Sequence, residues 1–203
     1  MSGAWDDKLA VAELVQTERA ARDQGQWERL AACYHPDSLV SISWIETSGP
    51  EFVEASKRAF AAGVRHLHQM APSIVSVNGD RALAESGCAI VLPGKVGDVA
   101  VTVTSQARLH VRAERRPDSL GGRWGIVSLR PVYFIDSVAA QVPGEIPVFD
   151  TARLAGYRQS YRFLSYVLVE SGKTPRPDLA GADRPGLTEA MLAAEAAWLA
   201  GRT

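Results

Sequence analysis

Two histidines have the spacing and residue type to support acid–base chemistry. His66 and His68 lie two residues apart in a segment that favours a strand, so both imidazoles are expected on one face of it, together with Met70. An imidazole whose pKa is at its ordinary value of about 6.5 accepts and releases protons at neutral pH. Either histidine could therefore transfer a proton if this face borders a cavity. A packed or solvent-facing histidine is the alternative interpretation.

Glu18 is the other titratable candidate. It follows Val15 by three residues and Leu14 by four, so it continues the apolar stripe of a predicted helix. Burial would raise the pKa of its carboxyl group and suit it to act as a general acid. The alternative is an exposed glutamate on the helix surface. Metal binding by the two histidines is disfavoured, because no third His or Cys is placed to complete a site.

These side chains must be positioned by the elements of an α+β fold. Apolar spacing predicts helices over 5–22, 27–34 and 50–62, with a strand over 38–47. Four strand-like segments follow, over residues 64–77, 81–92, 98–113 and 123–136, divided by turns at 78–80, 93–95 and 117–122. The segment over 98–113 alternates apolar and polar residues, which predicts that one face of the sheet is covered and the other is exposed to solvent. We expect a cone-shaped, curved antiparallel sheet that is covered by the N-terminal helices and has a pocket at its open end.

The chain is expected to divide into a cone domain over 1–140 and a C-terminal helical extension over 141–203. The extension should hold a helix over 150–171, a loop over 173–184 and a last helix that begins at Pro185. Tyrosines and arginines on the first of these helices suit a cover on the core or on a partner subunit.

Composition limits the classes of function. The 203 residues include 22 basic and 23 acidic side chains, and a net charge of −1 argues against a nucleic-acid partner. The two cysteines, Cys33 and Cys88, exclude a disulfide framework. The first ten residues do not resemble a signal peptide, and no apolar run is long enough to span a membrane. We expect a cytoplasmic protein with no membrane partner.

Several short motifs resemble the SnoaL-like branch of the nuclear-transport-factor-two-like superfamily. They are the string from Asp23 to Trp27, the pair Pro36-Asp37, an Ile-x-x-Val-x-Gly-Asp turn that ends at Asp80, and Trp124-Gly-Ile-Val-Ser-Leu. The resemblance covers roughly residues 5–136. It implies a cone-shaped α+β fold, a homodimer and a pocket for a small apolar ligand, with no cofactor and no metal. Members include dehydratases, isomerases, cyclases, an epoxide hydrolase and proteins that only bind ligands, so the fold alone does not identify a reaction.

The resemblance also implies roles for individual residues. His68 occupies the position of the catalytic histidine of dehydratase-like members, and Asp23 occupies that of the acid that orients or polarises it. A helix cap is the alternative role for Asp23.

The chain departs from the dehydratase pattern at three positions. Glu18 stands where some relatives have a tyrosine, and Pro131 stands where they have an arginine, with Arg130 one residue early and facing the opposite side. The segment Leu92-Pro93-Gly94 replaces a second histidine.

The leading hypothesis is a cofactor-independent lyase or isomerase for a small apolar cyclic substrate of the polyketide, steroid or terpenoid type. His68 would move a proton α to a carbonyl, Asp23 would hold it, and Glu18 or a tyrosine would assist. Tyr34, Trp44 and Tyr133 are candidates to line the substrate pocket with Met70, and core packing is their alternative role.

Two other functions stay open. One is a non-catalytic ligand-binding or dimerisation module. The other is a cyclase or epoxide hydrolase, which would need an acid–arginine–acid cluster. His35 and His110 are expected to be exposed, and Asp136 is expected to cap a loop.

Overall fold

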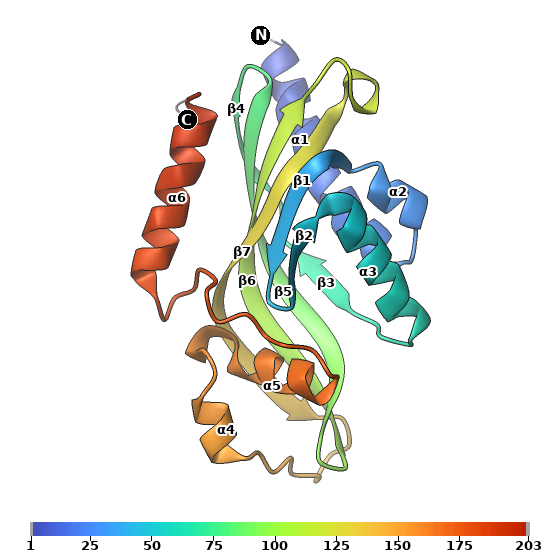
Figure 1. Cartoon of the computed structure of the whole chain (residues 1–203), viewed down its shortest axis with the longest axis vertical. Helices are drawn as coiled ribbons and strands as arrows, with labels where there is room; N and C mark the ends of the chain where they lie inside the picture. The colour runs from blue at the N-terminus through green and yellow to red at the C-terminus, as the bar shows by residue number, and fades with distance from the viewer. Residues whose placement is uncertain (1, 202–203) are drawn as a thin grey trace.

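A single mixed sheet of seven strands organises the computed structural model, which describes residues 2–201 (Figure 1). The strands are β1 (Tyr34–Ile42), β2 (Ile45–Ser48), β3 (Leu67–Met70), β4 (Ile74–Asn78), β5 (Arg81–Val96), β6 (Val99–Arg115) and β7 (Trp124–Ala140). Their order is β2-β1-β7-β6-β5-β3, and β4 also pairs with β5. The predicted curved α+β architecture is confirmed, except that β1 runs parallel to β7.

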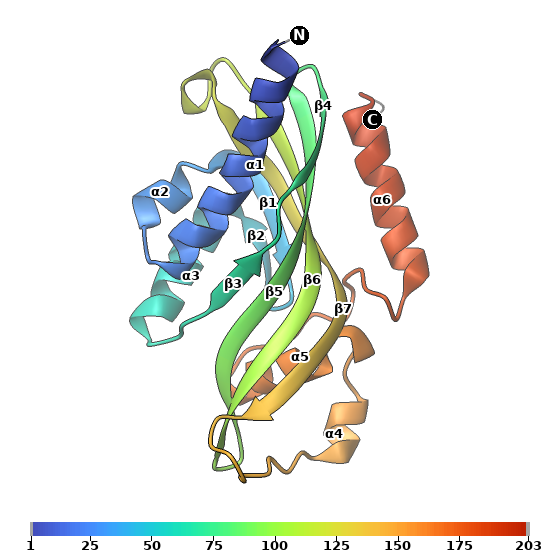
Figure 2. The same cartoon turned by 180° about the vertical axis from the view of Figure 1, so that it is seen from behind.

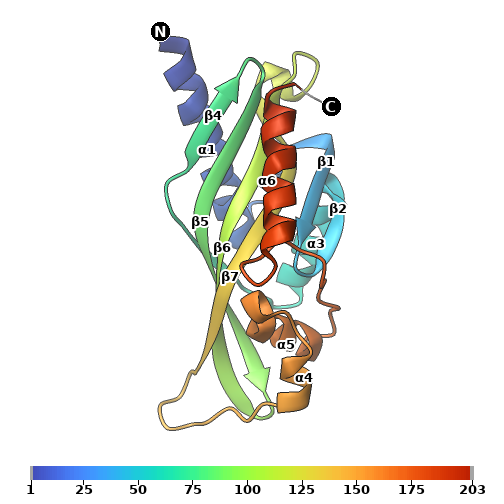
Figure 3. The same ribbon diagram turned by 90° about the vertical axis from the view of Figure 1, so that its left-hand side faces the viewer.

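Helices lie on both sides of this sheet. They are α1 (Ser2–Asp23), α2 (Trp27–Ala31), α3 (Gly49–Ala61), α4 (Thr151–Ala155), α5 (Arg162–Glu170) and α6 (Pro185–Leu199), with short 3₁₀ turns at Leu120–Gly122 and Gln159–Tyr161. Figure 3 shows α6 on one side of the sheet and α1 on the other. Among residues 2–201, no helix is both long and apolar enough to cross a membrane.

Two hydrophobic cores share the inner face of the sheet. In the upper core, Val11 and Val15 of α1 pack with Val111 of β6. In the lower core, Leu164 of α5 packs with Val103 of β6. Because side chains alternate along a strand, the odd-numbered positions of β6 share one face, where Val111 belongs to the core under α1 and Val103 to the core under α5. Figure 2 shows these two helices toward opposite ends of the long strands. The gap between α1 and α5 therefore falls at the middle of the sheet.

Some predicted elements are wrong in their bounds. The strand predicted over 38–47 is a hairpin of β1 and β2, and the strand over 64–77 is broken into β3 and β4. The helix over 150–171 is broken into α4, a 3₁₀ turn and α5. The helices predicted over 5–22 and 27–34 are present as α1 and α2, although α2 ends at Ala31 and Tyr34 already begins β1.

The turn predicted at 93–95 does not form, because β5 continues to Val96 and pairs with β6 as far as Val99. Gly94 instead allows a close approach of α5, since an added Cβ would lie 2.9 Å from Val167 Cγ1. The hairpin predicted at Asn78 is present, with Gly79 and Asp80 as its loop residues. Of these two, only Gly79 has a positive φ, so the turn is not of type I′, which needs a positive φ at both loop residues.

His35 and His110, which were expected to be exposed, are both buried. The ring of His35 makes hydrogen bonds to Ser119 Oγ (2.8 Å) and to the carbonyl oxygen of Glu114 (3.0 Å). Long-range partners therefore satisfy a histidine that the local sequence places at the end of a predicted helix.

Candidate functional site

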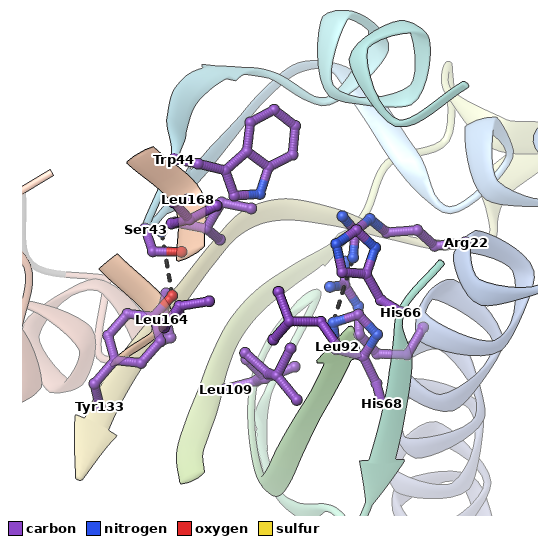
Figure 4. Close-up of a pocket in the computed structure, with 14 residues that line it drawn as sticks. Arg22, Ser43, Trp44, His66, His68, Leu92, Leu109, Tyr133, Leu164 and Leu168 are labelled. Atoms are coloured by element: carbon purple, nitrogen blue, oxygen red, sulfur yellow. Dashed lines mark hydrogen bonds between the residues drawn. The ribbon is translucent and has the colours of Figure 1, made fainter. Parts of the chain in front are cut away.

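A cavity lies between the two cores (Figure 4). Apolar side chains from four directions form most of its wall: Ile42 and Trp44 beside the β1–β2 turn, Ile90, Leu92 and Leu109 on β5 and β6, Pro131 and Tyr133 on β7, and Leu164 and Leu168 on α5. One wall is polar and consists of Arg19 and Arg22 from α1 with His66 and His68. The polar groups converge on one side of the cavity and the apolar groups on the other, an arrangement that is typical of small-molecule sites.

Asp23 binds His68 at two points. One carboxylate oxygen, Oδ2, accepts the backbone N–H of His68 at 2.6 Å, and Oδ1 lies 2.6 Å from the ring nitrogen Nδ1. A carboxylate can only accept, so Nδ1 carries the proton and Nε2 is left with a lone pair. This arrangement fixes both the ring orientation and the tautomer of His68. The structure thus brings together the two residues that the sequence motifs paired.

Asp23 does not cap the following helix. It is the last residue of α1, and the residue before α2 is Gln26, which makes no side-chain cap bond. A carboxylate at the C-terminal end of a helix is disfavoured by the helix dipole. The bonds to His68 offset that cost, which is typical of a residue kept for its site rather than for its helix.

The surroundings keep His68 neutral and Asp23 charged. Burial, together with the charges of Arg19 and Arg22, outweighs the bond to Asp23 and lowers the pKa of His68 to about 4. Burial on its own would raise the pKa of Asp23, but its hydrogen bonds with His68 and the charge of Arg22 hold that pKa below its ordinary value. At neutral pH, His68 is therefore a neutral base with a carboxylate behind it.

His66 lines the same cavity as His68, with ring centroids 6.3 Å apart. It lies just before β3, which begins at Leu67. Burial and the charge of Arg22 lower the pKa of His66 to about 3, so its ring is also neutral at pH 7. The expected side-by-side placement of the two imidazoles is present.

Glu18 and Tyr34 lie behind the cavity wall rather than in it, contrary to expectation. Glu18 is buried and forms a two-point ion pair with Arg19, and the Tyr34 hydroxyl donates to its carboxylate at 2.6 Å. The predicted role of Glu18 as a cavity-facing acid is replaced by that of a counter-ion, because its carboxylate is engaged by a guanidinium.

Three other predicted lining residues have different outcomes. Trp44 and Tyr133 line the cavity, and the Tyr133 hydroxyl accepts the backbone N–H of Ser43 at 3.1 Å. Met70 does not, because it packs against the upper core. Pro131 lines the cavity while Arg130 borders a hollow on the other face, as the register predicted.

The sequence analysis missed two cavity residues of α1, Arg19 and Arg22. Both are buried, and Arg22 donates to Ser56 Oγ at 3.2 Å and to His68 Nε2 at 3.3 Å. Their signal was present, because Arg22 continues the stripe of Val15 and Glu18 at helical spacing. A charged residue on a buried stripe needs a partner or a function, and this reasoning applies to Arg22 as it does to Glu18.

The C-terminal extension also contributes to the site. Leu164 and Leu168 of α5 close the apolar side of the cavity, and the ammonium of Lys173 lies 4.2 Å from the ring centroid of Trp44. No local pattern connects these residues to the histidines. Among residues 2–201, no three His, Cys, Asp or Glu side chains gather closely enough to hold a metal ion.

The fold and site define a class of protein: a curved α+β sheet with an acid–histidine pair in an apolar pocket. Residues 4–130 match the SnoaL-like domain, and the chain belongs to that family, within the nuclear-transport-factor-two-like superfamily. The family predicted from the short motifs is confirmed.

Comparisons with individual proteins agree with this family. A PEP2-like protein of Fusarium vanettenii is 27% identical over 163 residues, which span 79% of this chain and 68% of that protein. An uncharacterised protein of Aspergillus terreus is 28% identical over 196 residues, which span 90% of this chain and 72% of that protein.

Solved structures show the same fold at lower identity. The hexachlorocyclohexane dehydrochlorinase LinA-type3 of Novosphingobium barchaimii superposes with a TM-score of 0.57 at 18% identity, covering 71% of this chain and 97% of that one. A Mycobacterium tuberculosis protein of unknown function has a TM-score of 0.52 at 19% identity, covering 85% of this chain and 99% of that one. These likenesses concern the fold alone.

Proposed function

We propose that this protein is a lyase or isomerase that uses His68 as a general base, with no cofactor in the proton transfer. The observation that carries this proposal is the neutral, buried His68, held by Asp23 with Nδ1 as donor and Nε2 as acceptor. A base needs an unprotonated nitrogen within reach of substrate, and His68 lines the cavity.

The substrate is a small, largely apolar, cyclic molecule. The apolar walls bind its body, and Trp44 and Tyr133 offer flat surfaces to a ring. When Nε2 takes a proton from carbon, the ring becomes an imidazolium, and the Asp23 carboxylate stabilises that charge. Proton return to another carbon would complete an isomerisation, and loss of a β-substituent would complete an elimination.

A structural relative supports this class of reaction. The name of the LinA-type3 enzyme describes removal of hydrogen chloride from a chlorinated cyclohexane, which is an elimination on a small apolar ring. We carry over the reaction class and leave the substrate of that enzyme aside, because the two chains share only 18% identity.

The test measures exchange of α-protons in D₂O by NMR, with a panel of small cyclic ketones and β-hydroxyketones. We expect exchange by the wild-type protein and a loss of roughly 10²- to 10⁴-fold in His68→Ala, since general-base catalysis contributes that much. The exchange rate of Asp23→Asn should fall by a similar factor, because a neutral amide cannot stabilise the protonated ring of His68 as the carboxylate does.

Arg130→Gln is the matched control, because Arg130 borders a hollow on the opposite face of the sheet. It should exchange α-protons at the wild-type rate. A His68→Ala protein that remains within about threefold of wild type would contradict the proposal. Saturable binding of a panel ketone without exchange would favour the binding-only alternative.

We also propose a homodimer, as the family resemblance implies. Phe134 and the neighbouring Ile135 are exposed on the sheet surface, where Phe134 borders a hollow. Small residues and polar ones line this hollow together: Ala71, Gly87 and Ala89 with Gln69, Gln106 and Arg108. An exposed apolar surface beside a hollow is typical of a protein contact.

A further inference from the structure

Arg22 is a buried cation whose partners are all neutral. Its side chain is about 7% exposed, its Nε donates to Ser56 Oγ, its Nη1 donates to His68 Nε2, and its guanidinium carbon lies 5.2 Å from the ring centroid of Phe52. Within residues 2–201, no carboxylate forms an ion pair with it. The two acidic residues beside it on α1 are engaged elsewhere, Glu18 by Arg19 and Asp23 by His68.

Arg19 provides an internal comparison. It lies one turn earlier on the same helix, is about 3% exposed, and has its guanidinium carbon 5.8 Å from the same Phe52 ring. Burial lowers the pKa of either guanidinium, but the paired Glu18 raises the pKa of Arg19 above its ordinary value. For Arg22, burial and the charge of Arg19 lower the pKa to about 10. Only Arg22 has been desolvated without a counter-ion, which is costly in a folded protein.

Arg22 is also placed next to the reacting atom. Its Nη1 lies 3.3 Å from His68 Nε2, and both residues line the cavity (Figure 4). A guanidinium has five N–H donors, and Ser56 and His68 account for two of them. A ligand atom near Nε2 therefore comes within reach of unused donors of Arg22.

The rest of the polar wall favours negative charge as well. It contains Arg19 and the neutral rings of His66 and His68, and the ammonium of Lys173 lies over Trp44. No aspartate or glutamate is among the residues that line the cavity. A cationic ligand would be repelled here, and a purely apolar ligand would leave the charge of Arg22 without a counter-ion.

We propose that Arg22 binds the substrate oxygen that becomes negatively charged when His68 removes a proton. The substrate is then a carbonyl compound in which the acidic carbon is bonded to the carbonyl carbon. This inference rests on the proposed function and names the substrate class and the oxyanion partner of that site.

The step balances in atoms and charge. The C–H bond breaks and its proton goes to His68 Nε2, the electron pair forms a carbon–carbon double bond, and the carbonyl π pair moves to oxygen. Arg22 leaves its long contact with Nε2 and donates to the new enolate oxygen. Because the full charge exists only after proton transfer has begun, Arg22 interacts most strongly with the transition state and with the enolate, which is what accelerates a reaction.

The test uses 4-nitrophenol, a flat phenol whose phenolate is coloured, as a stable mimic of the enolate. Titrations at several pH values give separate affinities for phenol and phenolate. We expect wild-type protein to bind the phenolate at least tenfold more tightly than the phenol, and more tightly than the uncharged isostere 4-nitroanisole. Arg22→Gln should lose this preference at least tenfold, and Arg22→Lys should retain part of it.

Further variants separate the possible failures. His68→Gln should keep the phenolate preference while losing proton exchange, so a missing base and a missing anion site give different results. Arg130→Gln should bind the probe as wild type does. Melting curves verify that each variant is folded. If Arg22→Gln does not fold, the inference is tested by whether wild-type protein binds the phenolate more tightly than 4-nitroanisole.

Three outcomes would overturn the inference. One is equal binding of phenolate and 4-nitroanisole by wild-type protein, or no saturable binding of phenolate. Another is an unchanged phenolate preference in folded Arg22→Gln. The third is loss of the preference in Lys173→Gln instead, because that would place the anion at Lys173 rather than beside His68.

Discussion

At the scale of single residues, the candidate site depends on the balance of charge around one imidazole. Two arginines and burial keep His68 unprotonated, whereas Asp23 fixes its tautomer and prepares for the charge that a proton would bring. An isolated Asp–His pair would instead favour the imidazolium. Burial, together with the charges of Arg19 and Arg22, therefore makes His68 a base at neutral pH rather than an acid.

This balance predicts an unusual pH profile. A base works only when unprotonated, so kcat/KM for proton exchange should be constant from neutral pH down to about 5 and should fall as pH drops through about 4, the pKa of His68. A fall centred near the ordinary value of about 6.5 would contradict the electrostatic account.

Acid unfolding must be followed in the same buffers. Because the folded pKa values of His66 and His68 are depressed to about 3 and about 4, their contribution to the free energy of unfolding is complete above about pH 6.5 and is lost as pH falls toward those values. Circular dichroism at each pH separates loss of the base from loss of the fold.

At the scale of elements, long-range bonds decide where several segments turn. Residues Ser43 and Trp44 form the loop of the β1–β2 hairpin without a Gly, Asn or Asp to favour it. The Ser43 N–H donates to the Tyr133 hydroxyl, and the Ser43 carbonyl accepts the N–H of Arg176. Bonds from β7 and from the extension thus hold the turn that presents Trp44 to the cavity.

The predicted helix over 150–171 breaks for a similar reason. Arg158 lies between α4 and the 3₁₀ turn, and its guanidinium pairs with Asp183 and donates to the carbonyl oxygens of Pro177 and Leu179. A continuous helix would carry Arg158 away from these partners. A charge-assisted network of this kind outweighs the modest gain from a few more helical bonds.

Asp136 connects β7 to the start of α5 and gives a prediction at this scale. Its Oδ2 accepts the N–H of Leu164 in the first turn of α5 at 2.7 Å, so it binds the start of a helix rather than capping a loop as expected, while its Oδ1 has no hydrogen-bond partner among the described residues. Burial raises the pKa of Asp136 to about 6. Its contribution to stability is therefore fully present below about pH 4 and is lost as pH rises through 6.

Asp136→Asn should remove this pH dependence, because the amide oxygen still accepts from Leu164 and no charge is buried. We expect the variant to match wild type near pH 4 and to exceed it by roughly 3 kcal/mol at pH 8, measured by urea unfolding. The difference between the two proteins isolates Asp136, since the histidines contribute equally to both. A variant that is less stable than wild type at pH 8 would show that the carboxylate is stabilising.

At the scale of the whole molecule, the SnoaL-like match ends at residue 130, but residues beyond 130 also line the cavity. Leu164 and Leu168 complete its apolar side, and the lower core joins α5 to β5, β6 and β7. The ring centroids of Tyr133 and Tyr161 lie 4.6 Å apart at this junction. The extension therefore helps to determine the size of ligand that the pocket accepts.

The proposed homodimer is tested at the same scale. We expect light scattering to give the mass of a dimer for wild type at micromolar concentration. Phe134→Glu should weaken association at least tenfold, because it would bury an unpaired charge in the contact. Val148→Glu, in an exposed loop after β7, is the matched control and should remain dimeric. A monomeric wild-type protein, or a dimeric Phe134→Glu protein, would contradict this assignment.

Much of the architecture could be predicted from local patterns. Periodicity identified α1, α3, α6 and the long strands, because a helix or strand that buries one face must repeat its apolar residues at that spacing. Short motifs identified the family and paired Asp23 with His68. Each motif is local, whereas the pairing of Asp23 with a histidine 45 residues away came from the family resemblance.

Only the tertiary structure determines which groups each side chain contacts. Glu18 and Arg22 lie on a predictable helix face, but the hydrogen-bond partners of these residues and of the buried His35 come from segments 16 to 84 residues away. The break at Arg158 and the continuation of β5 through Gly94 likewise depended on distant partners. The spacing of residues along the chain determines which secondary structure a segment prefers and which face each side chain occupies. The burial and the protonation state of a group depend on all the atoms that surround it in space.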